Sequence, residues 1–228
     1  MLNLWRAATF TVIAALLVVA PLLSSAQYYN PTVTPPPCGW AMQSPLEQHY
    51  HDHEWGVPQT DDRVLFEFLL LESAQAGLSW RTVLEKRAGY RHHYAEFDPI
   101  RVAAFGEAAM ATMLADPGII RNRAKIEASI NNARVFLELQ ARHGSFARFL
   151  WGYVEGRPIQ SGFEEMQQIP AQTALSQQLA RDLKREGMRF FGPTIAYAYM
   201  QAVGLVNDHL RQCPCQQACR ALGQELSL

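Results

Sequence analysis

Residues 66–80 read Phe-Glu-Phe-Leu-Leu-Leu-Glu-Ser-Ala-Gln-Ala-Gly-Leu-Ser-Trp, and this stretch decides how the chain folds. Apolar residues recur here and just upstream at helical spacing, which predicts a helix capped by an aspartate at position 61 or 62. Its inward face is expected to hold Val64, Leu65, Phe68, Leu69 and Leu71. Gly77 ends this helix in a turn, and another helix begins at Trp80. Glu72 therefore lies on an apolar helix, one short turn away from an indole.

The same helical periodicity continues through the chain and predicts an all-α protein. Strand signals are scarce and no internal repeat is present, so one compact helical unit is expected from the 228 residues. Further helices are predicted for residues 80–86, 99–105, 107–114, 124–142, 146–154, 171–186 and 194–203. Residues 156–168 are rich in turn formers, and the pattern there predicts no regular element.

Composition limits the kinds of partner that the chain can bind. Hydrophobic residues make up 49% of the sequence, enough for one substantial core. Lys and Arg number 20 against 21 Asp and Glu, a formal net charge of −1. This balance excludes a polycationic nucleic-acid binder. Any contact with DNA must use a local basic surface together with backbone amides.

The N-terminal part differs in composition from the rest. Residues 1–27 resemble a secretory signal peptide, because Arg6 precedes an apolar run that ends in small residues. Residues 28–37 form a proline-rich linker. A globular domain is expected over residues 38–222, and a short tail over residues 223–228.

Cysteine and histidine residues stand near both ends of the expected domain. Twelve residues separate Cys38 from His51, and three separate His209 from Cys213. Thiolate and imidazole are ligands that zinc prefers, and four protein ligands leave no open position on the ion. The pattern predicts one structural zinc ion that joins the N- and C-terminal parts. Two later cysteines remain alternatives to Cys213, whose spacing from His209 is shorter.

Aromatic residues stand beside these expected ligands. Trp40 follows Cys38 closely, and Tyr50 and Trp55 flank His51. Aromatic residues usually belong to a core, so their positions alone do not define a site. Glu72 has small and apolar neighbours, and is either exposed on the outer face of its helix or a buried acid with a function.

Several separated blocks of sequence resemble the 3-methyladenine DNA glycosylase I family. The blocks are CGW (38–40), YHDHEWGVP (50–58), FEFLLLESAQAGLSW (66–80), FDP (97–99), GIIRNRAKI (118–126) and FFGPTIAYAYMQAVGLVNDH (190–209), followed by the terminal cysteines. The resemblance implies a fold similar to the helix-hairpin-helix glycosylases and a bound zinc at Cys38, His51, His209 and Cys213. It also implies hydrolytic excision of 3-methyladenine from alkylated double-stranded DNA, which leaves an abasic site.

The resemblance also implies roles for individual pocket residues. Glu72 is expected to be the catalytic residue, accepting in its ionised form a hydrogen bond from the exocyclic amine of the flipped-out base. The indole of Trp80 would stack on the electron-poor ring. Tyr50, Trp40 and Trp55 would shape the remainder of the pocket. Where the family carries an aromatic residue three positions before Tyr50, this chain has Glu47, which puts one pocket contact in question.

Three segments are expected to contact DNA. In the turn after the first helix, Gly77 allows close approach and Leu78 would fill the vacated base stack, with core packing as the alternative for Leu78. Gly192 and Thr194 stand at a helix start suited to a phosphate. Additional positive charge, or otherwise a solvated face, is expected from Arg121, Arg123 and Lys125.

An enzyme of this kind would act in the cytoplasm as a monomer, with no obligate protein partner and no membrane role. The leader-like residues 1–27 conflict with that location, and we interpret them as a mis-assigned start, with the true start near Val33. The alternative is an exported, zinc- or disulfide-stabilised helical protein without enzymatic activity. Asp208 is expected to support its neighbour His209 rather than to activate water.

Overall fold

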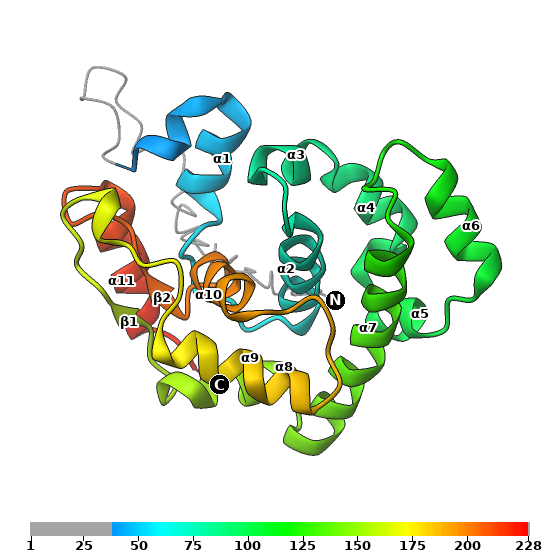
Figure 1. Cartoon of the computed structure of the whole chain (residues 1–228). Helices are drawn as coiled ribbons and strands as arrows, with labels where there is room; N and C mark the ends of the chain where they lie inside the picture. The colour runs from blue at the N-terminus through cyan, green and yellow to red at the C-terminus, as the bar shows by residue number, and fades with distance from the viewer. Residues whose placement is uncertain (1–37, 228) are drawn as a thin grey trace, which may run out of the picture. The chain divides into compact units, whose positions relative to one another are not determined.

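The computed structural model describes residues 38–227, which belong to one compact unit. Helices dominate this part of the chain (Figure 1). The predicted leader and linker, residues 1–37, lie outside the described residues. Within residues 38–227, no helix is both long enough and apolar enough to cross a lipid bilayer.

The central element is helix α2 (Asp62–Gln75), as the sequence predicts. Its N-cap is Asp61, whose carboxylate accepts hydrogen bonds from the backbone amides of Arg63 and Val64. Residues 65–74 are buried all around the helix, so α2 lies inside the core rather than on its surface. It packs against α3 (Trp80–Glu85), α7 (Arg123–His143), α8 (Phe146–Trp151) and α10 (Pro193–Ala202).

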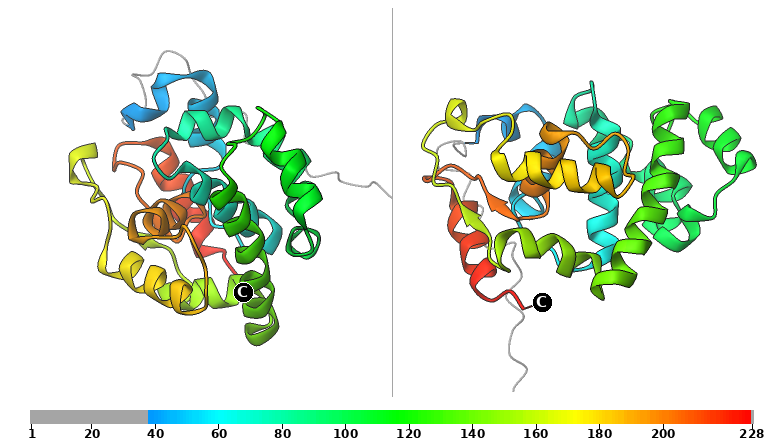
Figure 2. Two further views of the ribbon diagram at one scale, coloured as in Figure 1. Left: turned by 45° about the vertical axis from the view of Figure 1, so that its right-hand side comes forward. Right: turned by 60° about the horizontal axis from the view of Figure 1, so that its bottom comes forward.

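The remaining helices lie on the two sides of this core. α5 (Pro99–Ala103) and α6 (Glu107–Ala115) pack on α7, and α4 (Arg87–His93) follows α3. α9 (Ala174–Arg185) packs on α10 to form a helical hairpin. The views in Figure 2 show α5 and α6 in green on one side of this unit, away from the red helix α11 (Pro214–Gln224).

Short helices, 3₁₀ turns and one two-stranded sheet complete the fold. α1 (Pro45–His53) and a 3₁₀ turn (Gly39–Gln43) lie near α11 (Figures 1 and 2). β1 (Ile159–Gln160) pairs in parallel with β2 (Val206–Asn207). Other 3₁₀ turns are Ala95–Phe97, Gly152–Val154 and Met166–Gln168. The β1–β2 pair fixes the turn-rich segment before α9 to the chain that follows α10.

The predicted helices are confirmed, with ends that shift by up to three residues. The prediction for residues 146–154 combined α8 with the following 3₁₀ turn. The sequence pattern missed α1, α4, α11 and the two short strands. α1 carries local start signals, since Ser44 caps it and Pro45 occupies its first turn, but its polar, histidine-rich sequence lacks an extended apolar face.

The turn between α10 and β2 depends on Gly204. Its φ is +75°, a left-handed conformation that disfavours other residues. A Cβ at this position would lie 2.5 Å from the backbone nitrogen of Pro58 and 2.5 Å from the carbonyl carbon of Val57. Both atoms belong to the backbone and cannot move away as a flexible side chain would.

We therefore expect Gly204→Ala to lower the free energy of unfolding by about 3 kcal/mol or more, because it adds both a clash and backbone strain. Urea denaturation followed by circular dichroism measures the change. The control is Gly152→Ala, at a helical φ of −59° with open space around the position, and it should have little effect. Equal midpoints for the two variants would contradict the prediction.

Candidate active site and metal centre

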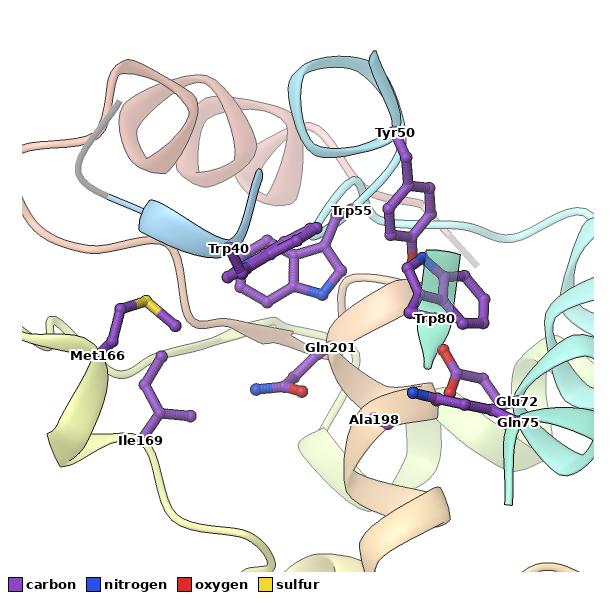
Figure 3. A pocket seen from close by; sticks show the side chains of 10 residues that line it. All are labelled: Trp40, Tyr50, Trp55, Glu72, Gln75, Trp80, Met166, Ile169, Ala198 and Gln201. Atoms are coloured by element: carbon purple, nitrogen blue, oxygen red, sulfur yellow. The ribbon is translucent and has the colours of Figure 1, made fainter. Parts of the chain in front are cut away.

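A cavity of about 320 Å³ opens between the N-terminal segment, α2, α3 and α10 (Figure 3). Its volume is near the lower end of the range of about 300–1,000 Å³ that is usual for small-molecule sites. The lining residues are Trp40, Tyr50, Trp55, Glu72, Gln75, Trp80, Met166, Ile169, Ala198 and Gln201. The structure thus gathers all five of the predicted pocket residues around one cavity.

Glu72 is the buried acid of this cavity. It lies in the last turns of α2, where its side chain is surrounded by the core and only 3% of the residue is exposed. Its Oε2 atom has no hydrogen-bond partner. Burial raises the pKa of the carboxyl group from 4.5 to about 8, because the charged form loses its hydration. An unpaired buried oxygen beside an open cavity is suited to bind a ligand donor.

Trp80 and Tyr50 form the aromatic wall above Glu72. Trp80 is the first residue of α3, which Ser79 caps by accepting a hydrogen bond from the Thr82 amide. The Tyr50 and Trp80 rings lie 5.1 Å apart between centroids and are tilted by 51°. The indole Nε1 of Trp80 is buried without a partner, which adds an unused donor to the cavity. Burial also raises the pKa of Tyr50, so its hydroxyl stays protonated.

Trp40 and Trp55 form the opposite aromatic corner. Their rings meet edge to face, with centroids 5.2 Å apart and an interplanar angle of 80°. The Trp55 ring also packs edge to face on the imidazole of His209, at 4.6 Å between centroids. Both indoles are thereby held by the chain segments that carry the predicted metal ligands.

Sequence reasoning missed half of the pocket lining. Gln75 lies one turn after Glu72 on α2, and that spacing could have identified it. Ala198 and Gln201 share one face of α10 at a spacing of three residues. Met166 lies in the turn-rich segment, where no pattern was available, and Ile169 directly follows that segment. These residues add two amides and an apolar floor to the predicted aromatic walls (Figure 3).

Cys38, His51, His209 and Cys213 converge in one buried cluster, with ligand atoms within 4.8 Å of one another. His51 Nε2 lies 3.1 Å from His209 Nδ1 and 3.6 Å from Cys213 Sγ. His209 Nδ1 lies 3.7 Å from Cys213 Sγ and 3.9 Å from Cys38 Sγ. Around a tetrahedral zinc ion, with bonds of about 2.0–2.1 Å to nitrogen and about 2.3 Å to sulfur, such atoms stand roughly 3.5 Å apart. The donor set and its spacing therefore fit the ion.

Each histidine of the cluster has an oxygen acceptor for its other ring nitrogen. His51 Nδ1 donates to the Asp52 carboxylate at 2.8 Å, and His209 Nε2 donates to the backbone carbonyl of Trp55 at 2.9 Å. Such contacts fix the tautomer of a metal-binding imidazole and aim its free nitrogen at the ion. Cys215 joins a second possible grouping with His51 and Asp52, but it is less buried than the four cysteine and histidine residues.

The turn after α2 is exposed and carries the predicted wedge. Gly77 adopts a φ of +81° with open space around it, and Leu78 is 41% exposed. Lys125 of α7 contacts this turn from inside the protein, because its ammonium donates to the backbone carbonyls of Ala74 at 2.8 Å and Ala76 at 2.7 Å. This contact binds a cation to the C-terminal carbonyls of α2. The ammonium group of Lys125 therefore binds the protein backbone, whereas the sequence predicted that it faces outward.

The other predicted phosphate contacts are all exposed. Arg121 precedes α7. Arg123 forms ion pairs with Glu107 at 2.8 Å and Glu127 at 3.6 Å. Gly192 is the N-cap residue of α10, and Thr194 lies in its first turn. These positions remain predictions as DNA contacts.

α7 holds the hairpin between α9 and α10 in place. The Asn132 amide group donates to the carbonyl oxygen of Arg189 and accepts from its backbone amide, both at 2.8 Å. Asn131 donates to the Gly187 carbonyl oxygen at 2.8 Å. The side chains of Asn131 and Asn132 thus satisfy backbone groups of the loop before Gly192 and hold that loop in place.

Asp208 and Glu47, whose roles the sequence left open, are both buried. Asp208 is buried and accepts hydrogen bonds from Ser161, Tyr197 and Gln201, and it does not line the cavity. Glu47 is buried at the start of α1, where Ser44 Oγ donates to its carboxylate at 2.8 Å. Glu47 therefore takes part in capping α1 and does not line the cavity either.

The helical fold is shared with solved DNA glycosylases. A crystal structure of 3-methyladenine DNA glycosylase I is 50% identical, covers 78% of this chain and 98% of its own, and superposes with a TM-score of 0.76. The Staphylococcus aureus 3-methyladenine DNA glycosylase I, solved to explain 3-methyladenine recognition, is 36% identical, covers 79% and 96%, and gives a TM-score of 0.77.

Sequence comparison identifies the family within this class. Residues 40–217 match the model of the family described as methyladenine glycosylase. DNA-3-methyladenine glycosylase 1 of Escherichia coli is 47% identical over 178 residues, which cover 78% of this chain and 95% of the relative. The chain therefore belongs to the methyladenine glycosylase family, and the resemblance seen in the sequence is confirmed.

The raised pKa of Glu72 predicts how stability changes with pH. Between about pH 4.5 and about pH 8 the folded protein keeps a proton on Glu72 that the unfolded chain has lost. This group therefore lowers the free energy of unfolding as pH rises through that window. Glu72→Gln removes the effect, so the variant should be more stable than the wild-type protein at pH 9, with a much smaller difference at pH 5.

Urea denaturation of both proteins at pH 5, 7 and 9 measures this difference. Glu138→Gln, which changes an exposed carboxylate on α7, is the matched control and should follow the wild-type protein at each pH. A difference between Glu72→Gln and wild type that does not grow with pH would show that the carboxyl group does not titrate as its burial implies.

Proposed function

We propose that this protein is a DNA-3-methyladenine glycosylase, which flips the damaged nucleotide out of alkylated double-stranded DNA and releases the base by hydrolysis. The observation that carries the proposal is the unpartnered Glu72 carboxyl group, buried below an aromatic wall in a cavity of base size. The family membership and the names of its close relatives support the same activity. A base within a duplex is inaccessible, so the site requires an extruded nucleotide.

Excision of 3-methyladenine depends more on binding of the damaged base than on strong acid catalysis. Methylation at N3 makes adenine cationic in the nucleotide, so the bond between N9 and the sugar C1′ is already weakened. When that bond breaks, its electron pair neutralises the base, and a water molecule adds to C1′ and loses a proton. The protein assists by holding the cation and excluding other bases.

Glu72 and the aromatic rings fit a cationic purine. A positive charge beside Glu72 lowers the pKa of the carboxyl group, so binding draws the acid into its ionised form. The carboxylate then accepts a hydrogen bond from the exocyclic amine, which a guanine carbonyl cannot donate. The exposed face of the Trp80 ring attracts an electron-poor ring by a cation–π contact. Tyr50, Trp40 and Trp55 confine the base from the remaining sides.

DNA binding is proposed for the exposed turns around the cavity. Leu78, held at the tip of the turn after α2, is the proposed wedge, and Gly77 lets the backbone approach the duplex. Gly192 and Thr194 at the start of α10 are proposed to bind a phosphate through backbone amides. Arg121 and Arg123 would add charge from the start of α7, whereas Lys125 supports the wedge turn from within.

The cysteine and histidine cluster is proposed to hold one structural zinc ion. Cys38, His51, His209 and Cys213 would fill all four positions, so the ion would stabilise the fold and leave water activation to other groups. The four cysteines at positions 38, 213, 215 and 219 are free thiols, which supports metal binding over the disulfide-stabilised exported alternative. We propose a monomer that acts on cytoplasmic DNA.

The hydrolysis is proposed to proceed without a covalent lysine intermediate. No lysine occurs among the residues that line the cavity, and Lys125, the nearby cation on α7, donates to backbone carbonyls of α2. An amine in that position is not available to attack the sugar. A monofunctional reaction that ends at the abasic site follows from this arrangement.

If Glu72 must ionise, activity should depend on pH in a defined direction. We expect kcat/KM for release of 3-methyladenine from methylated duplex DNA to rise between pH 6 and pH 8 and to level off above about pH 8. Glu72→Gln should lower kcat/KM on the order of 100-fold and flatten the profile. Chromatography of the released base measures both effects, after subtraction of spontaneous release. A wild-type profile that is flat over this range would refute the requirement.

Removing one zinc ligand should reduce both metal content and stability. Cys38→Ser is expected to lose most of its zinc, measured by mass spectrometry of the metal, and to unfold at a lower temperature, because a structural metal contributes to folding free energy. Cys215→Ser is the matched control and should retain one zinc ion per chain. Zinc loss in Cys215→Ser with retention in Cys38→Ser would show that Cys215, and not Cys38, binds the ion.

A further inference from the structure

Asp208, a buried carboxylate behind the cavity, accepts a hydrogen bond from Gln201, which is one of the polar side chains that line the cavity. Asp208 is 1% exposed and lies between β2 and the metal cluster. Its oxygens accept hydrogen bonds from the hydroxyl groups of Ser161 and Tyr197 and, at 2.8 Å, from the amide nitrogen of Gln201. Three donors, one from the segment after β1 and two from α10, therefore surround one acid, so its position is tightly fixed.

This contact determines which way the Gln201 amide points. Gln201 lies near the end of α10 and lines the cavity (Figure 3). A carboxylate accepts hydrogen bonds but cannot donate them, so Nε2 must face Asp208 and Oε1 must face away. The backbone carbonyl of Gln201 also accepts a hydrogen bond from the Gly56 amide at 3.0 Å, which fixes the base of the side chain. The amide oxygen and one N–H hydrogen are left for a ligand.

We propose that Gln201 is a second base-reading residue and that Asp208 is the positioning residue that orients it. An amide in this orientation pairs with an adenine edge by accepting from the exocyclic amine and donating to the adjacent ring nitrogen. On the edge that carries N7, a purine nucleotide with a carbonyl in place of that amine presents two acceptors side by side and leaves the Gln201 oxygen unpaired. This selection rests on the proposed function, because it assumes that a purine enters the cavity.

Glu72 and Gln201 are complementary in this arrangement. An exocyclic amine carries two hydrogens, and the cavity offers one acceptor from α2 and another from α10. Figure 3 shows the Glu72 carboxyl group on one side and the Gln201 amide further along the cavity, with Ala198 between them. Glu72 responds to the charge of the damaged base, whereas the neutral amide of Gln201 responds to the pattern of donors and acceptors on its edge.

The test compares two free bases that differ at the proposed contact. 3-Methyladenine and 3-methylhypoxanthine, in which a carbonyl replaces the amine, are titrated into the full-length protein by isothermal titration calorimetry. The wild-type protein should prefer the amine on the order of tenfold or more, and Gln201→Met should reduce that preference roughly several-fold, with the remainder supplied by Glu72. The matched control is Gln140→Met, which removes a comparable amide-to-carboxylate contact with Asp62, at 2.7 Å, in a part-buried position away from the cavity.

Variants of Asp208 test the positioning role. Asp208→Ala should reduce the preference for the amine, while Asp208→Asn should restore it, because its carbonyl can accept from Gln201 and Tyr197 and its amide can donate to Ser161. If Asp208 acts through Gln201, the double variant Asp208→Ala with Gln201→Met should discriminate no less than Gln201→Met alone. Asp182→Ala, which removes the carboxylate that accepts from Tyr153, controls for general loss of stability.

The results separate this inference from the function on which it rests. Wild-type discrimination in Gln201→Met would overturn the base-reading role, and additive losses in the double variant would overturn the positioning role. If Asp208→Ala does not fold, as thermal unfolding would reveal, unchanged discrimination in Gln201→Met still decides against the proposal. A wild-type protein that neither binds 3-methyladenine nor releases it from methylated DNA would instead overturn the proposed function.

Discussion

The site depends on contact between residues from opposite ends of the described chain. Cys38 and His209 are 171 positions apart in sequence, yet their side chains meet in the buried cluster with His51 and Cys213. Bringing such distant segments together costs conformational entropy, and the compact donor set is suited to offset that cost by binding a metal ion. Without this contact the 3₁₀ turn that carries Trp40 and the helix that carries Tyr50 would lose their anchor against the C-terminal segment.

The same C-terminal segment positions both halves of the cavity. His209 donates to the carbonyl of Trp55 and packs edge to face on its ring, which sets the aromatic corner. Its neighbour Asp208 binds Gln201, which sets the amide on α10. One stretch of two residues therefore connects the metal cluster to an aromatic wall and to a polar group. A disturbance at the cluster should reach the cavity through these contacts even though no cluster residue lines it.

The sequence predicted those parts of the site that depend on local pattern or on unusual chemistry. Glu72 and Trp80 could be recognised because a single short segment carries both, and the cluster could be recognised because cysteine and histidine pairs stand out in any sequence. Gln201 could not be recognised, since its role arises from Asp208 and from the fold that places α10 beside α2. For the same reason the sequence could not show that Lys125 binds the backbone of α2, because a basic run alone does not reveal what each cation contacts. Helix α1 was missed because its stability comes from capping and from the cluster rather than from an apolar stripe.

In the proposed reaction, the burial of Glu72 makes the charge of the base part of its recognition. In the free protein, burial raises the pKa of this carboxyl group to about 8, so near neutral pH it is mainly an uncharged acid. An undamaged adenine is neutral and does not stabilise the ionised form of Glu72, because a carboxylate facing it would remain buried without a counter-charge. A methylated adenine brings the positive charge that stabilises the carboxylate, and the proton leaves. Under the role proposed for Glu72, the apolar surroundings that make the acid weak are what would allow it to distinguish a cation from a neutral base of nearly the same shape. A carboxylate held ionised by a nearby arginine would lack this distinction, since its charge would already be paired before the base arrived.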